Sequence, residues 1–184
     1  MLTAFERKFG DPSHPAIGAD DLESLRKEAG GLSFGGGLYR VLSGAGAEAL
    51  ELEVYRAFPD HDKMISCFAS DWLGRVFAIR KDIDQVLMFE PGTADVLNIG
   101  ASLKAFHSQE ILNFAEEALA KSFFEAWTKA GNAVPAPDQC VGYRKPLFHG
   151  GEDEIGNLEL IDLDVYWTVS APFIAKARQV LRGR

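Results

Sequence analysis

The sequence contains few residues that would cross-link the chain or anchor it in a membrane. Its 184 residues include two cysteines, Cys67 and Cys140, which lie in apolar segments and are interpreted as buried free thiols of a reducing compartment. No window approaches the roughly 18 uninterrupted apolar residues of a membrane-spanning helix, and the first residues are too charged for a signal peptide. We therefore expect a soluble, cytoplasmic protein without a membrane partner.

Basic residues are also scarce relative to acidic ones. The chain has 19 lysines and arginines against 27 acidic residues, a net charge of −8. A surface of this sign repels phosphate backbones, so nucleic acid is not an expected partner. The same field accelerates the encounter with a basic protein. The composition therefore favours a protein partner with a basic surface.

The glycine-rich residues 30–46 raise the question of a phosphate-binding loop. They contain the glycine spacing of a P-loop, but Gly37 occupies the position of the lysine that would reach the phosphates. A looser dinucleotide-type pattern begins at Gly44, yet the next predicted strand turns straight back at Gly74 instead of entering a crossover helix. We interpret the segment as a loop that passes close to packed backbone.

Other catalytic signatures are sparse. The four histidines are scattered, and the sequence has neither H-E-x-x-H nor C-x-x-C, so no cofactor or metal site is predicted. Asp60, His61 and Asp62 form an acid-histidine run in a predicted loop. The residues leave open an alternative hypothesis, a metal- or nucleotide-binding enzyme that uses this run or the loop at residues 30–46.

The apolar pattern predicts a sheet built from hairpins. Residues 64–70 and 75–81 are two strand-like runs joined by a short turn at Leu73 and Gly74, so they must pair antiparallel, at or near the centre of the sheet. Residues 85–92 and 95–100 continue this pair as a meander, and residues 38–43 form an earlier strand.

Two helices are expected to cover the sheet, at residues 47–58 and 108–130. The longer one carries apolar residues at intervals of three and four on one face. The predicted core consists of Phe68, Phe77, Leu119, Phe123 and Trp127. Towards the end of the chain, residues 158–170 alternate as an antiparallel strand and residues 171–181 form a terminal helix.

These patterns predict a single-domain α+β fold with a twisted, largely antiparallel sheet flanked by helices. The segments "FASDWLGRVFAI" (68–79), the Pro91-Gly92 pair and Tyr166-Trp167 resemble the C-terminal domain of a type VI secretion immunity protein family, near the SUKH superfamily of bacterial immunity proteins. The opening "FERKFGDPSHP" (5–15) is similar to the GAD-related N-terminal segment of that family. The resemblance implies a short N-terminal part at residues 1–37 and a SUKH-like domain at residues 38–184.

The same resemblance implies a non-enzymatic protein that binds and neutralises a cognate toxin, often a nuclease. We expect its binding residues to be Glu152, Asp153 and Glu154 in an exposed acidic loop, with Asp71 and Trp72 at the hairpin turn as an anchor. The alternatives are a solvated turn for the loop and a core position for Trp72. A regulatory or scaffolding SUKH-like protein is the third functional hypothesis.

Overall fold

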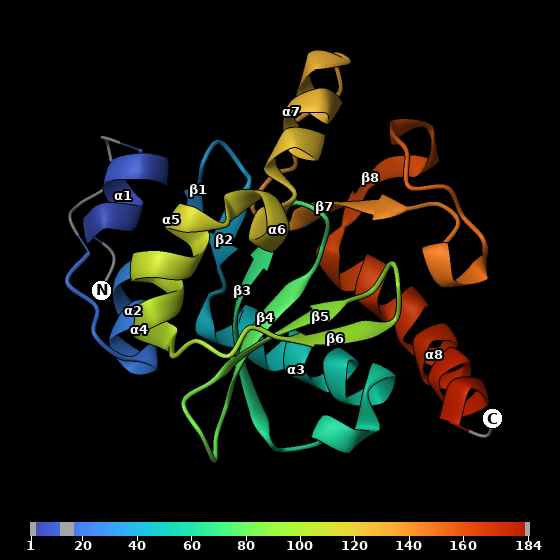
Figure 1. The fold of residues 1–184 in the computed structure, drawn as a ribbon, viewed down its shortest axis with the longest axis horizontal. Coiled ribbons are helices and arrows are strands. Elements are labelled where there is room, and N and C mark those ends of the chain that lie inside the picture. The colour runs from blue at the N-terminus through green and yellow to red at the C-terminus, as the bar shows by residue number, and fades with distance from the viewer. Residues whose placement is uncertain (1–2, 12–16, 183–184) are drawn as a thin grey trace.

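A six-stranded sheet forms the middle layer of the computed structural model, which describes residues 3–11 and 17–182 (Figure 1). Its strands, in spatial order, are β1 (Ser33–Phe34), β2 (Tyr39–Val41), β3 (Ile65–Asp71), β4 (Val76–Arg80), β5 (Val86–Glu90) and β6 (Asp95–Asn98). Every neighbouring pair is antiparallel, so the sheet is a meander in chain order. This arrangement confirms the predicted α+β fold.

The predicted hairpin occupies the centre of that sheet. Strands β3 and β4 pair antiparallel, and Gly74 adopts a φ of 75° in the short turn between them. Along β4, Val76 and Ala78 join the core on one face of the sheet, whereas Phe77 and Ile79 join the core on the other face. Because both faces are covered, the strand is apolar throughout rather than alternating.

Two helices cover one face of the sheet, α3 (Gly44–Ala57) and α8 (Leu163–Arg182). Ser43 caps the start of helix α3, where its side chain accepts a hydrogen bond from the Gly46 N–H, and the helix buries Leu50 and Val54. Both cysteines lie in this core as buried free thiols, as expected.

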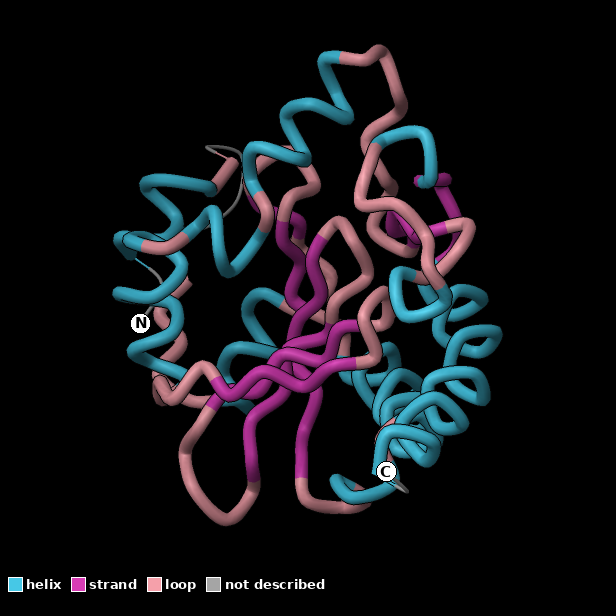
Figure 2. Tube along the Cα trace, turned by 45° about the vertical axis from the view of Figure 1, so that its right-hand side comes forward, coloured by secondary structure: helices cyan, strands magenta, loops and turns pink. Residues whose placement is uncertain are grey.

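Short helices cover the other face, except that the last of them, α7, projects beyond the end of the sheet (Figures 1 and 2). They are α1 (Thr3–Phe9), α2 (Leu22–Ala29), α4 (Leu103–Ala105), a π-helical turn η2 (Phe106–Glu110), α5 (Ile111–Asn113), α6 (Ala115–Leu119) and α7 (Lys121–Lys129). Phe5 of α1 packs edge-on against Tyr39, with ring centroids 5.4 Å apart. Predicted core residues Phe68, Phe77, Leu119 and Trp127 are buried here.

The single long helix predicted at residues 108–130 is wrong. Helix α6 ends at Ala120, which adopts a left-handed φ of 48°, and α7 starts afresh from there. The Trp72 indole N–H donates to the Leu119 carbonyl oxygen at 2.9 Å, and the Arg75 guanidinium donates to the Ala118 carbonyl oxygen at 3.1 Å. Buried side chains of the hairpin turn therefore donate hydrogen bonds to the last carbonyl oxygens of α6, which would otherwise lack a partner where the helix ends.

The strand predicted at residues 158–170 is also wrong in its second half. Strand β8 (Leu158–Asp162) pairs antiparallel with β7 (Gln139–Tyr143) as a separate two-stranded sheet, and α8 begins at Leu163 rather than at residue 171. The buried positions Leu163, Tyr166, Trp167 and Ile174 follow helical spacing. The aromatic pair therefore belongs to the first turns of the helix.

Three 3-10 turns complete the described part of the chain: η1 (Pro59–His61), η3 (Leu147–His149) and η4 (Ile155–Asn157). Within the described residues, no helix combines the length and apolar character needed to span a bilayer. Of the GAD-related stretch, residues 12–15 lie outside the described residues, and the division of the chain at residue 37 stays a prediction.

Phe77 and Phe123 provide a test of the core. Phe77 is fully buried, whereas Phe123 is only partly buried, against the expectation for that residue. We expect Phe77→Ala to lower the free energy of unfolding by roughly 3–5 kcal/mol, because an aromatic core site is emptied. Phe123→Ala should cost clearly less. Urea unfolding of both variants measures the difference, and equal losses would contradict this assignment of the core.

Candidate functional site

Negative charge is concentrated in residues 138–164, which we call the acidic unit. It contains seven acidic residues and two basic ones, Arg144 and Lys145, so it carries −5 of the net charge of −8. The acidic residues are Asp138, Glu152, Asp153, Glu154, Glu159, Asp162 and Asp164. Strands β7 and β8 form the body of the unit, beside the six-stranded sheet and above α8 in Figure 1.

Backbone contacts fix the acidic unit to the rest of the fold. The Val141 N–H donates to the carbonyl oxygen of Trp72 at 2.6 Å, which joins β7 to the central hairpin turn. A Cβ atom on Gly142 would lie 2.7 Å from the Tyr166 ring, so only glycine permits β7 to approach α8 this closely. The unit is therefore docked on the fold rather than tethered to it.

The loop with the predicted binding residues is also held in place. The Asn157 amide donates to the carbonyl oxygens of Lys145 (2.8 Å) and Glu152 (2.9 Å), and its oxygen accepts from the Lys145 N–H. Glu152, Asp153 and Glu154 are exposed. Asp153 additionally accepts a hydrogen bond from the Tyr143 hydroxyl at 2.6 Å. The acidic loop therefore presents its charges from a defined conformation.

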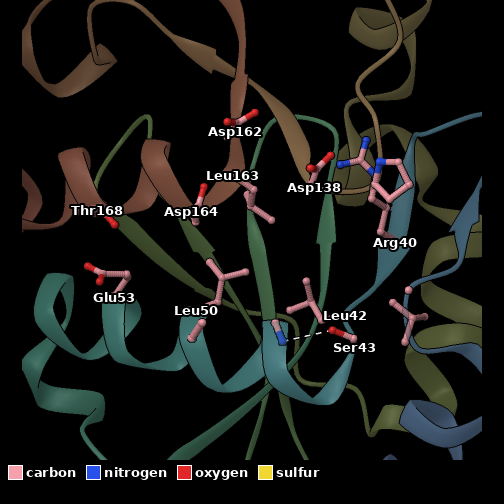
Figure 3. A pocket seen from close by; sticks show the side chains of 15 residues that line it. Arg40, Leu42, Ser43, Leu50, Glu53, Asp138, Asp162, Leu163, Asp164 and Thr168 are labelled. Atoms are coloured by element: carbon pink, nitrogen blue, oxygen red, sulfur yellow. Dashed lines mark hydrogen bonds between the residues drawn. The ribbon is translucent and has the colours of Figure 1, made fainter.

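A cavity of about 860 Å³ lies between the acidic unit and α3. Figure 3 shows Asp138, Asp162 and Asp164 on its upper side and Leu42 and Leu50 below them. The leucines and the carboxylates together suit a long basic side chain, because lysine and arginine bury an alkyl stem and keep a charged head. These three aspartates were missed by the sequence analysis, since residues far apart in the chain meet only in the folded state.

Arg40 forms part of the cavity wall. Its guanidinium is buried and donates to the carbonyl oxygens of Pro135 (2.9 Å), Gly37 (3.4 Å) and Gln139. Burial lowers the pKa of Arg40, while the negative charges of Asp71 and Asp138 oppose that shift. The side chain thus fastens residues 135–139, which lead into the acidic unit.

The predicted anchor at the hairpin turn is wrong, because Asp71 and Trp72 are both 0% exposed. The Asp71 carboxylate accepts from the Leu73 N–H (3.0 Å), the Arg75 N–H (2.9 Å) and the Arg75 side chain (2.6 Å). Burial raises the pKa of Asp71, and the Arg75 guanidinium and these N–H groups oppose the shift. Both side chains form hydrogen bonds inside the fold and are not accessible to a partner.

The polar groups of this turn extend to Glu90. The Arg75 guanidinium lies 3.7 Å from the Glu90 carboxylate. Burial raises the pKa of Glu90 from its ordinary value of 4.5 to about 7; Arg75 opposes the shift, and the charges of Asp71 and Asp153 add to it. The negative charges of the predicted residues Asp71 and Asp153 therefore both act on Glu90, a residue that no local motif indicated.

Asp60 and His61, two residues of the alternative enzyme site, make contacts within the fold. The His61 ring packs edge-on against Phe89 at 5.3 Å, and Asp60 lies 3.9 Å from Arg178. Burial lowers the pKa of His61, and the positive charges of Arg178 and Arg80 add to the shift. Over residues 3–11 and 17–182, no group of three or more His, Cys, Asp or Glu side chains is placed to hold a metal ion.

The glycine-rich loop makes the turn between β1 and β2. Gly35, Gly36 and Gly37 all have φ values between 62° and 97°, a region that disfavours other residues. A Cβ atom on Gly37 would lie 2.7 Å from the Val134 side chain, in agreement with a loop that passes close to packed atoms. Because β2 and β3 pair antiparallel, α3 is not the crossover helix of a dinucleotide fold.

The fold is shared with a solved protein of very different sequence. The crystal structure of Atu4351 from Agrobacterium tumefaciens matches with a TM-score of 0.63 and 15% identity, over 94% of this chain and 89% of that one. At this identity the likeness shows the fold alone. No family model and no curated protein matches the chain.

Glu90 makes stability depend on pH. Its folded pKa of about 7 exceeds the unfolded value, so the folded state binds the extra proton between pH 4.5 and 7. The contribution of Glu90 to stability is therefore lost as the pH rises through this window. Glutamine at this position does not titrate, so Glu90→Gln should not share this loss. The free energy of unfolding of the variant minus that of the wild type should therefore rise by up to about 3 kcal/mol from pH 5 to pH 8.

Urea unfolding across this pH range measures the effect, and the exposed Glu117→Gln serves as a control that should follow the wild type. A constant difference between Glu90→Gln and the wild type would show that Glu90 does not hold its proton in the folded state.

Proposed function

We propose that this protein is a non-enzymatic immunity protein that binds and neutralises a cognate secreted toxin, such as a nuclease. The observation that carries the proposal is the concentration of −5 charge units in residues 138–164, on a unit docked firmly on the fold. The basic groove of a nuclease is the complementary surface. The resemblance of the sequence to type VI secretion immunity proteins supports the same conclusion.

The acidic unit offers two kinds of contact to such a partner. Glu152 and Glu154 are exposed and steer a basic surface towards the unit, which acts on the association rate. The cavity beside Asp138, Asp162 and Asp164 accepts the alkyl stem and charged head of a lysine or arginine. A contact that removes such a side chain from water acts on the dissociation rate.

Charge reversal in the acidic loop tests the proposal. Glu152→Lys combined with Glu154→Lys should lower the association rate with the toxin encoded beside the gene by about tenfold. The double variant should also weaken protection of cells that express this toxin. Its melting temperature should change by no more than about two degrees, because exposed loop charges contribute little to folding. Surface-immobilised binding kinetics and survival assays provide the readouts.

The matched control is Glu23→Lys combined with Glu117→Lys, two exposed carboxylates outside the acidic unit. This control changes the net charge equally and should reduce the association rate less. Full protection by the loop variant would remove the loop from the interface. A shift of the melting temperature with a metal ion or a nucleotide, or turnover abolished by His61→Ala, would favour the enzyme alternative instead.

A further inference from the structure

Strand β8 pairs with β7 along one edge only. The register places Leu160 opposite Val141. The Val141 N–H donates to the Trp72 carbonyl oxygen at 2.6 Å rather than to β8. In an antiparallel pair, opposite residues either bond to each other or both turn their backbone groups outward. Leu160 therefore turns its N–H and C=O groups to the free edge of β8.

The free edge presents four backbone groups in a row. They are the Leu158 carbonyl, the Leu160 N–H and carbonyl, and the Asp162 N–H, because every second residue of a strand points the same way. Among the described residues, none supplies a hydrogen-bond partner to these four groups. Unpaired N–H and C=O groups along an edge are a template for a further strand.

A cavity of about 600 Å³ adjoins this strand. It is lined by Leu158 and Leu160 of β8 and by Trp127 of α7, among others. The two leucines lie on one face of the strand, because side chains alternate along it. Leu158 is buried, whereas Leu160 is 37% exposed. A strand paired with Leu160 would place every second side chain on the same face, so the cavity provides room for an apolar one.

We propose that an extended segment of the toxin pairs with the free edge of β8 as an added strand, and that this segment carries lysine or arginine. Main-chain hydrogen bonds of such a strand contribute affinity, and the side chains that alternate along it contribute specificity. The inference rests on the proposed function, since it names how the acidic unit holds the same partner.

Charge is the reason for choosing a basic partner rather than a second copy. Strand β8 lies within residues 138–164, which carry a net charge of −5. Glu159 of the strand is exposed, although it lies 3.5 Å from Arg144. Two copies joined along β8 would bring two such units together, and like charges oppose strand pairing. The acidic loop precedes β8 directly, through η4, so the charges that steer the toxin adjoin the edge that receives it.

Proline at position 160 tests the edge. Leu160→Pro removes an outward N–H and no hydrogen bond to β7, and proline is accepted on edge strands where the N–H faces solvent. The dissociation rate of the complex with the toxin encoded beside the gene should rise about tenfold or more, because the added strand loses a bond and meets the proline ring. Leu160→Ala is the matched control. It removes the same side chain, keeps the N–H and should accelerate dissociation clearly less.

Amide hydrogen exchange of the intact wild type is a second readout that needs no variant. Binding of the toxin should slow exchange of the Leu160 amide about tenfold or more, because the amide becomes paired. The amide of Asp82, exposed in the turn between β4 and β5, should not change. Circular dichroism and melting temperature establish that the two variants at position 160 are folded.

The outcomes separate this inference from the proposed function. A toxin that binds while the Leu160 amide is unchanged, or that dissociates equally fast from Leu160→Pro and Leu160→Ala, would overturn the strand pairing and leave toxin binding in place. Protection of the Leu160 amide that rises with the concentration of the protein alone would show that a second copy covers the edge instead. A wild type that does not bind the toxin would overturn both proposals.

Discussion

The buried ion pair between Asp71 and Arg75 is the interaction on which both layers of helices and the acidic unit depend. It closes the turn between the two central strands, and Asp71 accepts two of the turn's own N–H groups. The turn also forms hydrogen bonds with three other elements of the fold. Trp72 and Arg75 bond to α6, the Trp72 carbonyl receives β7, and the Gly74 carbonyl receives the Trp167 indole of α8. Removing one partner of a buried pair costs about 3–5 kcal/mol, so this turn tolerates little change.

The residues that stabilise the fold around this turn differ from those that are exposed to solvent. The aromatic and acidic side chains at the hairpin turn are buried, whereas Glu152 and Glu154 face solvent on a unit that the same turn holds in place. A binding surface needs fixed geometry because each side chain ordered on association costs about 0.5–1.5 kcal/mol. The acidic loop meets that need through Asn157 and the Tyr143 hydroxyl.

The two charged regions at the end of the chain have opposite sign and adjoin one another. Residues 138–164 carry a net charge of −5, whereas all the charged residues of the following stretch, 165–184, are basic. The net charge of the whole chain, −8, does not reveal this difference between the two regions. Because salt screens exposed charges over roughly 10 Å, the local charge of a surface matters more for a contact than the total charge does.

The sequence by itself determined what depends on near neighbours. The hairpin at residues 64–81, the helix ending near Phe58 and the exposure of Glu152, Asp153 and Glu154 were predictable, because period, turn residues and local charge decide them. The tertiary structure alone decided the break at Ala120, the burial of Trp72 and the meeting of Asp138 with Asp162 at one cavity. Each of these needs contacts between residues that are distant along the chain. The carbonyls of Ala118 and Leu119, next to this break, accept hydrogen bonds from a turn more than forty residues earlier in the chain.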